Sequence, residues 1–314
     1  MRCVDLFAGV GGIRLGFENA GFSIVFSNDF EPACKETFDL NFNDSPLIIK
    51  DINKVNNDSI PDFDILLGGF PCQPFSIAGY RQGFKDSKGR GNLFFRIAEI
   101  IEEKKPKVVF LENVKNLESH DNGKTFKVIK ETLEELGYYV KSKIVNTMLH
   151  GNLPQNRERI LIVGFLDKNV ADNFSFPGKM KLNKEIKDLL ETDVDEKYYY
   201  EGKPLYDKLK YNIKKKNTAY QWRRRYVREN KSGVIPTLTA NMGTGGHNVP
   251  IILDDKGIRK LTPRECFIFQ GFPKSYNLPN IADSKLYKQA GNSVSVTVIE
   301  RVAKNIKKAL ENGN

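Results

Sequence analysis

Cysteine is scarce in this chain, with four residues in 314, and their spacing argues against two common uses of a thiol. Cys3, Cys34, Cys72 and Cys266 form no C-x-x-C pair, and none has a histidine at zinc-site spacing. This spacing predicts no metal site. A disulfide framework is not expected either, because the chain is long. For Cys72, in the stretch GGFPCQPFS, two interpretations remain open: a buried apolar side chain or a nucleophile.

Long apolar runs are also missing. No stretch reaches the roughly 18 apolar residues that a transmembrane helix needs. The first residues, Met1 to Asp5, place an acid where a signal peptide would have its apolar stretch. We therefore predict a cytoplasmic protein without a membrane partner, whose N-terminus is the first strand of a folded domain.

Acidic residues are outnumbered, with 39 Asp and Glu against 49 Lys and Arg, which gives a formal net charge of +10. Such a charge favours a polyanionic partner, although many basic proteins bind no nucleic acid. Between Lys203 and Lys231 there are eleven basic residues and two acids, with four tyrosines and the single tryptophan among them. The segment is either a solvated loop or, as the interleaved aromatic residues favour, a nucleic-acid surface.

Short apolar runs alternate with helical patterns through the first half of the chain. The continuous run 106–111 is typical of a strand in a buried parallel sheet. Helical spacing covers 93–104 and 126–136. This alternation predicts an α/β fold, with helices on both faces of the sheet. After about residue 170 the pattern weakens, and it returns from 261 to end in an amphipathic helix, which predicts a second, smaller domain in between.

A glycine-rich turn follows the first predicted strand. The stretch DLFAGVGG holds Gly9, Gly11 and Gly12, but it lacks both the dinucleotide fingerprint and the Lys-Ser/Thr of a phosphate loop. Asp29 ends the second strand, where acids commonly bind ribose hydroxyls. Phe30 would lie against an adenine ring, and Asp51 would accept from an adenine amino group. The alternative role for each acid, Asp29 or Asp51, is a helix cap or a charge on a loop. Together these residues favour S-adenosylmethionine over a nicotinamide cofactor.

Cys72 follows a predicted strand, at the edge where open α/β sheets place ligands. Glu112, in FLENV, ends another apolar run, where a carboxylate is costly unless it has a partner or a task. Arg157 and Arg159, in PQNRERI, precede a further strand. A cysteine, a carboxylate and arginines at successive strand ends favour a catalytic cluster over an inert core thiol.

Six ordered blocks now carry a resemblance: DLFAGVGG, GGFPCQPFS, ENVKN, QNRERI, RKLTPRECFIFQGFP and QAGNSV. With them, the chain resembles the DNA (cytosine-5)-methyltransferases of bacterial restriction–modification systems, over almost its full length outside residues 172–235. The resemblance implies an S-adenosylmethionine-dependent, Rossmann-like α/β fold with a smaller target-recognition domain. It assigns 1–171 to the cofactor-binding and catalytic domain, 172–258 to target recognition, and 259–314 to a return segment that completes the catalytic domain.

The resemblance also implies roles for individual residues. Cys72 matches the nucleophile that attacks cytosine C6, Glu112 the residue that contacts N3 and the exocyclic amine, and Arg159 the arginine that holds the pyrimidine, with Arg157 nearby. S-adenosyl-L-methionine is the expected methyl donor, leaving S-adenosyl-L-homocysteine as product. Its expected contacts are Phe7, Gly9, Gly11, Asp29, Phe30, Asp51, Pro71, Leu93 and Asn292.

Double-stranded DNA is the implied partner, and the expected DNA-binding residues come from two regions. The block around Cys72 and the loop expected at 75–92 supply Gln73, Ser76 and Arg81. The expected target-recognition domain supplies Arg223, Arg224, Arg225, Arg228, Thr237, Thr239, Asn241 and His247. We further expect a monomer of bacterial, archaeal or phage origin, with a cognate restriction endonuclease that shares the target sequence without binding. The sequence does not predict which DNA site is read.

Three other functions remain as alternatives. A tRNA cytosine-5 methyltransferase has the same fold, but the Cys-Phe-Thr element typical of that group is absent here. A catalytically silent DNA-binding protein is disfavoured by the intact Cys72, Glu112 and Arg159. A nicotinamide oxidoreductase is disfavoured by the glycine spacing.

Overall fold

A computed structural model describes residues 1–71, 93–244 and 249–313. The chain folds into two compact units. Unit 1 consists of Met1–Val145, Glu158–Pro177 and Ile299–Asn314, and unit 2 of Asn146–Arg157 and Gly178–Val298. Compactness does not locate a function, so the functional boundaries expected near residues 171 and 258 stay a prediction.

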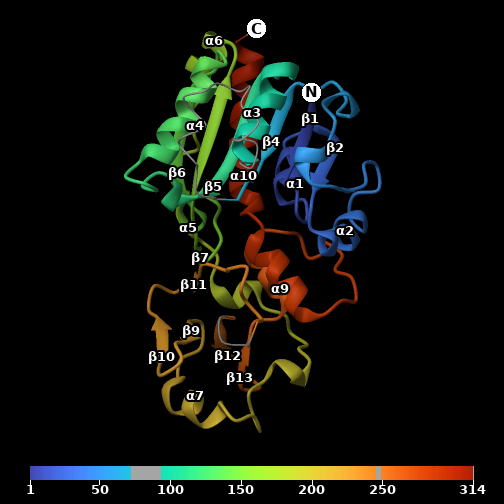
Figure 1. Cartoon of the computed structure of the whole chain (residues 1–314). Coiled ribbons are helices and arrows are strands. Elements are labelled where there is room, and N and C mark those ends of the chain that lie inside the picture. Colours follow the sequence, from blue (N-terminus) through green and yellow to red (C-terminus); the bar gives the residue numbers. More distant parts are fainter. Residues whose placement is uncertain (72–92, 245–248, 314) are drawn as a thin grey trace. The chain divides into compact units, whose positions relative to one another are not determined.

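Unit 1 is built on a seven-stranded sheet with the order β3-β2-β1-β4-β5-β8-β6 within the described ranges (Figure 1). Its strands are β1 (Arg2–Leu6), β2 (Ser23–Asp29), β3 (Ile48–Ile49), β4 (Ile65–Gly68), β5 (Val108–Val114), β6 (Tyr139–Asn146) and β8 (Glu158–Phe165). Neighbours from β3 to β5 pair in parallel, whereas β8 runs antiparallel to β5. The predicted α/β fold with a large parallel sheet is confirmed.

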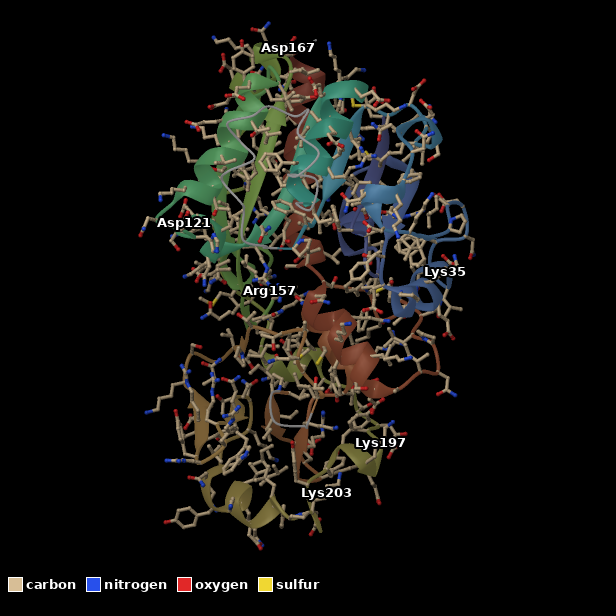
Figure 2. All side chains as sticks on the ribbon, viewed as in Figure 1. Lys35, Asp121, Arg157, Asp167, Lys197 and Lys203 are labelled. Atoms are coloured by element: carbon tan, nitrogen blue, oxygen red, sulfur yellow. The ribbon has the colours of Figure 1, made fainter. Side chains whose placement is uncertain are left out.

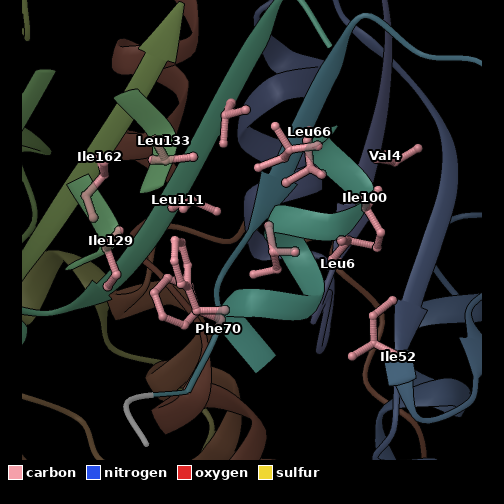
Figure 3. Close-up of a cluster of buried hydrophobic side chains, with 14 of the residues drawn as sticks. Val4, Leu6, Ile52, Leu66, Phe70, Ile100, Leu111, Ile129, Leu133 and Ile162 are labelled. Carbon is pink, nitrogen blue, oxygen red and sulfur yellow. The ribbon is translucent and has the colours of Figure 1, made fainter. Parts of the chain in front are cut away.

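Helices cover both faces of this sheet. They are α1 (Gly12–Asn19), α2 (Pro32–Asp39), α3 (Leu93–Lys104), α4 (Lys124–Glu135), α6 (Lys168–Asn173) and α10 (Val296–Asn312, in unit 1 from Ile299). Side chains of α3 and α4 pack with Leu66 and Leu111 in one apolar cluster (Figure 3). Phe110 points the other way and meets Phe17 of α1, with ring centroids 5.3 Å apart. Successive side chains of β5 therefore pack against helices on opposite faces of the sheet.

The strand directions bring several chain ends to one edge of the sheet. β1, β2, β4 and β5 are mutually parallel, so their carboxyl ends share that edge. Because β8 runs the opposite way, its beginning lies there too, with Arg159 paired to Val114. Segments far apart in the chain thus end together beside Gly68, Val114 and Asp29.

Unit 2 is smaller and irregular. Its four-stranded sheet has the order β10-β9-β12-β13, and β11 pairs with β7. Its strands and helices are α5 (Thr147–His150), β7 (Gln155–Asn156), α7 (Tyr206–Asn212), β9 (Ala219–Trp222), β10 (Val227–Asn230), β11 (Ile235–Pro236), β12 (Ile251–Leu253), β13 (Ile258–Lys260), α8 (Pro263–Phe269) and α9 (Asp283–Asn292). The described ranges also contain short 3₁₀ helices: η1 (Ile52–Lys54), η2 (Asn57–Ser59), η4 (Lys115–Leu117), η5 (Ile186–Leu189) and η6 (Glu196–Tyr198). No helix in the described part of the chain is long and apolar enough to cross a membrane.

A buried ion pair connects β13 to α8 in unit 2. Both side chains of the pair, Arg259 and Glu265, are fully buried. Two guanidinium nitrogens of Arg259 donate to the two Glu265 oxygens, each at 2.8 Å. Glu265 also accepts the backbone N–H of Thr262 at 2.8 Å, which closes a capping box at the start of α8. Burial alone would lower the pKa of Arg259, but the facing carboxylates of Glu265 and Asp254 raise it, so the guanidinium stays charged.

We expect Glu265→Gln to lower the free energy of unfolding by about 3 kcal/mol, because it leaves the Arg259 charge buried with one partner fewer. Urea unfolding followed by circular dichroism measures the change. The matched control is Asp255→Asn, which breaks the exposed pair with Lys216 and should change stability by less than about 0.5 kcal/mol. Equal effects of the two substitutions would contradict the assigned role of the buried pair.

Candidate active site

The shared strand edge of unit 1 holds a carboxylate and a guanidinium in contact. Glu112 Oε1 of β5 lies 3.0 Å from Arg159 Nε of β8, and both side chains are largely buried. The antiparallel register pairs Glu112 with Leu161 and Val114 with Arg159, so the two charged residues are diagonal neighbours on one face. The sheet thus brings together two of the predicted catalytic residues.

The chain segment that leads into Cys72 passes this pair. A Cβ placed on Gly69 would lie 3.8 Å from Glu112 Oε2 and 3.2 Å from Ile13 Cδ1. The next residue, Phe70, is held through its carbonyl, which accepts the side-chain N–H of Asn113 at 2.9 Å. The ENV block therefore supplies both the carboxylate and the anchor for the backbone after β4.

Cys72 itself lies outside the described residues, as do Gln73, Ser76, Arg81 and the expected loop 75–92. The other cysteines, Cys3, Cys34 and Cys266, are buried. Burial raises the pKa of the Cys3 and Cys266 thiols, which keeps them protonated and unreactive.

The glycine turn after β1 has the backbone of a close-approach site. Phe7 and Gly9 have φ values of 58° and 55°, in the left-handed region that non-glycine residues rarely adopt. A Cβ on Gly9 would meet nothing within 4 Å, so the turn borders open space. The Gly9 N–H donates to Asp29 Oδ2 at 2.8 Å, which joins the ends of β1 and β2. Burial raises the pKa of Asp29, and backbone N–H donors, including that of Gly9, oppose the rise.

The remaining expected cofactor residues of unit 1 lie around these strand ends. Phe30, directly after β2, is 72% exposed. Asp51 caps η1, because its Oδ1 accepts the Asn53 backbone N–H at 3.0 Å. Pro71 is exposed, and Leu93 begins α3 half-buried. One oxygen of Asp51 therefore has the helix-capping role that was the alternative to cofactor binding. The ring of Phe30 is largely uncovered.

Arg157 and Asn292 belong to unit 2. The buried guanidinium of Arg157 (Figure 2) donates to backbone carbonyls of Leu238, Gly291 and Ser293. These contacts tie the segment after β11 to the C-terminal end of α9, which is a structural task; the expected catalytic role of Arg157 stays a prediction. Asn292 ends α9 and is exposed.

The basic residues expected to bind DNA gather on the β9–β10 hairpin of unit 2. Arg223, Arg224 and Arg225 are exposed in its turn, and Arg228 is exposed on β10. A polar cavity of about 410 Å³ opens beside them; it is lined by Asn156, Gln221, Arg223, Arg228, Asn230, Pro236, Thr237, Thr239 and Asn241. The expected residue His247 lies outside the described ranges.

Sequence reasoning missed several residues of these sites. Asn113 carries no charge, and only the sheet shows that it holds Phe70. Gln221 and Asn230 look like ordinary strand residues, but they line the cavity next to Arg228. The sequence did contain a signal for Gln221: it lies two residues before Arg223, and every second side chain of a strand lies on the same face.

A family model described as C-5 cytosine-specific DNA methylase matches residues 1–308. The Type II methyltransferase M.Bsp6I of Bacillus sp. (strain RFL6) is 54% identical over 315 residues, covering 99% of both chains. The Type II methyltransferase M.HhaI of Haemophilus parahaemolyticus is 41% identical, covering 99% of this chain and 95% of its own.

Solved structures share the fold at low identity. Dnmt2 methyltransferase of S. pombe superposes with a TM-score of 0.75 at 21% identity and covers 99% of each chain. A DNMT2 variant from Spodoptera frugiperda reaches 0.74 at 21% identity, with 98% and 99% covered. The predicted fold class of an S-adenosylmethionine-dependent methyltransferase is thereby confirmed.

The buried carboxyl of Asp5 should make the stability of the protein depend on pH. This β1 residue is fully buried, and burial raises its pKa from 3.8 to about 8, although nearby Arg14 opposes the rise. Between these two values the folded protein holds a proton that the unfolded chain releases, so stability should fall as pH rises. Compared with the wild type, Asp5→Asn should remove a slope of at most about 1.4 kcal/mol per pH unit, measured by urea unfolding from pH 5 to 8.

Asp64 offers a control of opposite sign. Although burial would raise its pKa, the Lys107 ammonium at 2.9 Å and the Arg2 N–H lower it. Asp64 therefore stabilises the fold above its unfolded pKa and loses this effect toward acid, so Asp64→Asn should leave the slope from pH 5 to 8 unchanged. A wild-type slope that persists in Asp5→Asn would show that Asp5 is not its source.

Proposed function

Since this chain belongs to the C-5 cytosine-specific DNA methylase family, it is a DNA (cytosine-5)-methyltransferase, and we propose that it works through a covalent Cys72–cytosine intermediate on a flipped-out base. The observation that carries the proposal is the Glu112–Arg159 pair beside the segment that leads into Cys72. The DNA substrate follows from the family; the roles of individual residues are part of the proposal.

The chemistry requires a nucleophile and an acid. Cytosine C5 is too weakly nucleophilic to take a methyl group unaided. In the proposed path the Cys72 thiolate adds to C6, the bond electrons move toward N3, and C5 becomes enamine-like. Glu112 hydrogen-bonds N3 and the exocyclic amine and so stabilises the charge developing on the ring. After C5 takes the methyl group, loss of its proton and elimination of the thiol restore the ring.

Arg159 is proposed to orient Glu112 and to hold the pyrimidine. Its Nε faces Glu112 Oε1, which leaves the far nitrogens of the planar group for other acceptors. One of them donates to the Glu158 carbonyl at 2.8 Å, which fixes the plane of the guanidinium. Because C5 and C6 are covered in a stacked duplex, the base must leave the helix, at a cost of a few kcal/mol.

The residues of the glycine turn fit S-adenosylmethionine, which supplies the methyl group when bound. The open space at Gly9 accommodates a ligand close to the backbone, and the strained φ of Phe7 is of the kind found at ligand sites. We propose that Asp29 binds ribose hydroxyls, that Phe30 packs on the adenine, and that Asp51 accepts from its amino group. Gly11, Pro71, Leu93 and Asn292 complete the proposed contacts.

Target choice is proposed to lie in residues 172–258, since the catalytic residues must serve any cytosine. The exposed arginines in the turn of the β9–β10 hairpin match the phosphate backbone of duplex DNA. We also propose that the protein acts as a monomer in the cytoplasm, alongside an endonuclease that shares its target.

Substitution of Cys72 tests the covalent step. Cys72→Ala should reduce transfer of labelled methyl from S-adenosylmethionine to duplex DNA to background, while the unfolding midpoint and cofactor affinity stay near wild type. With 5-fluorocytosine in the target, fluorine cannot leave as the proton does, so wild type should form a trapped adduct and the variant none. Substantial turnover by Cys72→Ala would sink the nucleophile assignment, and methylation of tRNA in place of DNA would contradict the substrate.

Glu112 has a matched neighbour for a second test. Glu112→Gln should lower kcat at least about 100-fold, because it removes the acid at N3. Glu158→Gln, one residue before Arg159, breaks only the surface pair with Lys115 and should stay within about twofold of wild type. Single-turnover rates separate chemistry from product release. Similar rates for the two variants would remove Glu112 from the mechanism.

A further inference from the structure

The polar cavity of unit 2 contains two kinds of side chain. In the first kind, a hydroxyl or amide hydrogen already donates to a group inside the protein. The Thr237 hydroxyl donates to the Asn156 carbonyl at 2.6 Å, and the Thr239 hydroxyl donates to Asn241 Oδ1 at 2.6 Å. The side-chain amide of Asn230 donates to the Val234 carbonyl. These residues shape the walls and have few donors left for a ligand.

The second kind of side chain has donors that are not used inside the described part of the protein, and Arg228 is of this kind. Within the described residues its guanidinium makes no hydrogen bond or ion pair, although it lines the cavity and lies on a strand. Directly opposite, across the hairpin, lies Gln221, whose Oε1 accepts an Arg223 Nη2 hydrogen at 3.1 Å. Gln221 thus engages Arg223, and the five N–H donors of Arg228 remain for something that enters the cavity.

Building on the proposed function, we propose that Arg228 reads a guanine of the DNA target from the major groove, donating to its O6 and N7, while Gln221 positions Arg223 beside it. Guanine is the base whose major-groove edge presents two adjacent acceptors, which the planar fork of arginine matches. A strand also positions a side chain more accurately than a turn does.

A phosphate contact is the competing role for Arg228. The hairpin turn already provides Arg224 and Arg225, which are exposed and do not line the cavity. Those two residues suit the backbone of any sequence, whereas Arg228 is surrounded by amide and hydroxyl groups that border a recess. The position therefore favours base reading for Arg228 and phosphate binding for the turn.

The test compares binding of single-atom DNA analogues. Duplexes selected by the wild-type protein from a random library define the target, and each of its guanines is replaced in turn by 7-deazaguanine, which lacks the N7 acceptor. We expect wild-type affinity to fall about tenfold at one guanine. Arg228→Ala should bind the unmodified target about tenfold more weakly and should not distinguish it from the same analogue. Arg228→Gln gives a second variant, and unfolding midpoints check that both fold.

Arg225→Ala is the matched control. It should weaken binding to target and analogue equally and reduce the salt dependence of binding, as loss of a phosphate contact does. The inference is overturned if the wild type tolerates 7-deazaguanine at every position, if the target holds no fixed guanine, or if Arg228→Ala keeps the wild-type penalty. Methyl transfer to the selected duplex is measured separately: its absence would refute the proposed function, whereas the affinity comparison still decides the role of Arg228.

Discussion

The register between β5 and β8 determines where the charged groups of unit 1 meet. Val114 lies opposite Arg159 and Glu112 opposite Leu161, so the carboxylate and the guanidinium share one face of the sheet. A slip of one residue would turn either side chain to the other face. The register is itself set by packing, because Ile160 and Ile162 belong to the apolar cluster that α3 and α4 cover. A hydrophobic constraint thus places a polar pair.

Unit 2 has little regular structure, so side-chain hydrogen bonds to the backbone hold its loops in place. Arg157 does so by binding three backbone carbonyls, and Gln155 adds bonds to the Phe269 carbonyl and the Leu238 N–H at 2.9 and 3.2 Å. A Cβ on Gly291 would come within 2.2 Å of the Thr239 backbone, so only glycine allows this approach. These contacts fix the backbone at Leu238 and Thr239, on one side of the polar cavity, while the Arg228 donors stay unused within the described residues.

The proposed assignment places the chemistry and the choice of target on different elements. The residues that would act on cytosine lie at a sheet edge whose geometry depends on a buried core. Arg228, the residue proposed to read a base, lies on a hairpin, where exposed side chains can be exchanged at little cost to stability. If the proposal holds, substitution of exposed side chains such as Arg228 would alter recognition without changing the residues of the Glu112–Arg159 contact.

The sequence by itself determined the α/β class, the positions of several strands and helices of unit 1, and the residue types of the candidate site. It did so because apolar periodicity and ordered motifs are local properties; helix α3, for example, was predicted with the bounds 93–104 that the structure has. Only the tertiary structure decided that β8 runs antiparallel to β5, that Arg157 binds carbonyls of unit 2, and that Gln221 faces Arg228. Strand direction and cross-strand register depend on contacts between residues distant in the chain, which no local pattern encodes.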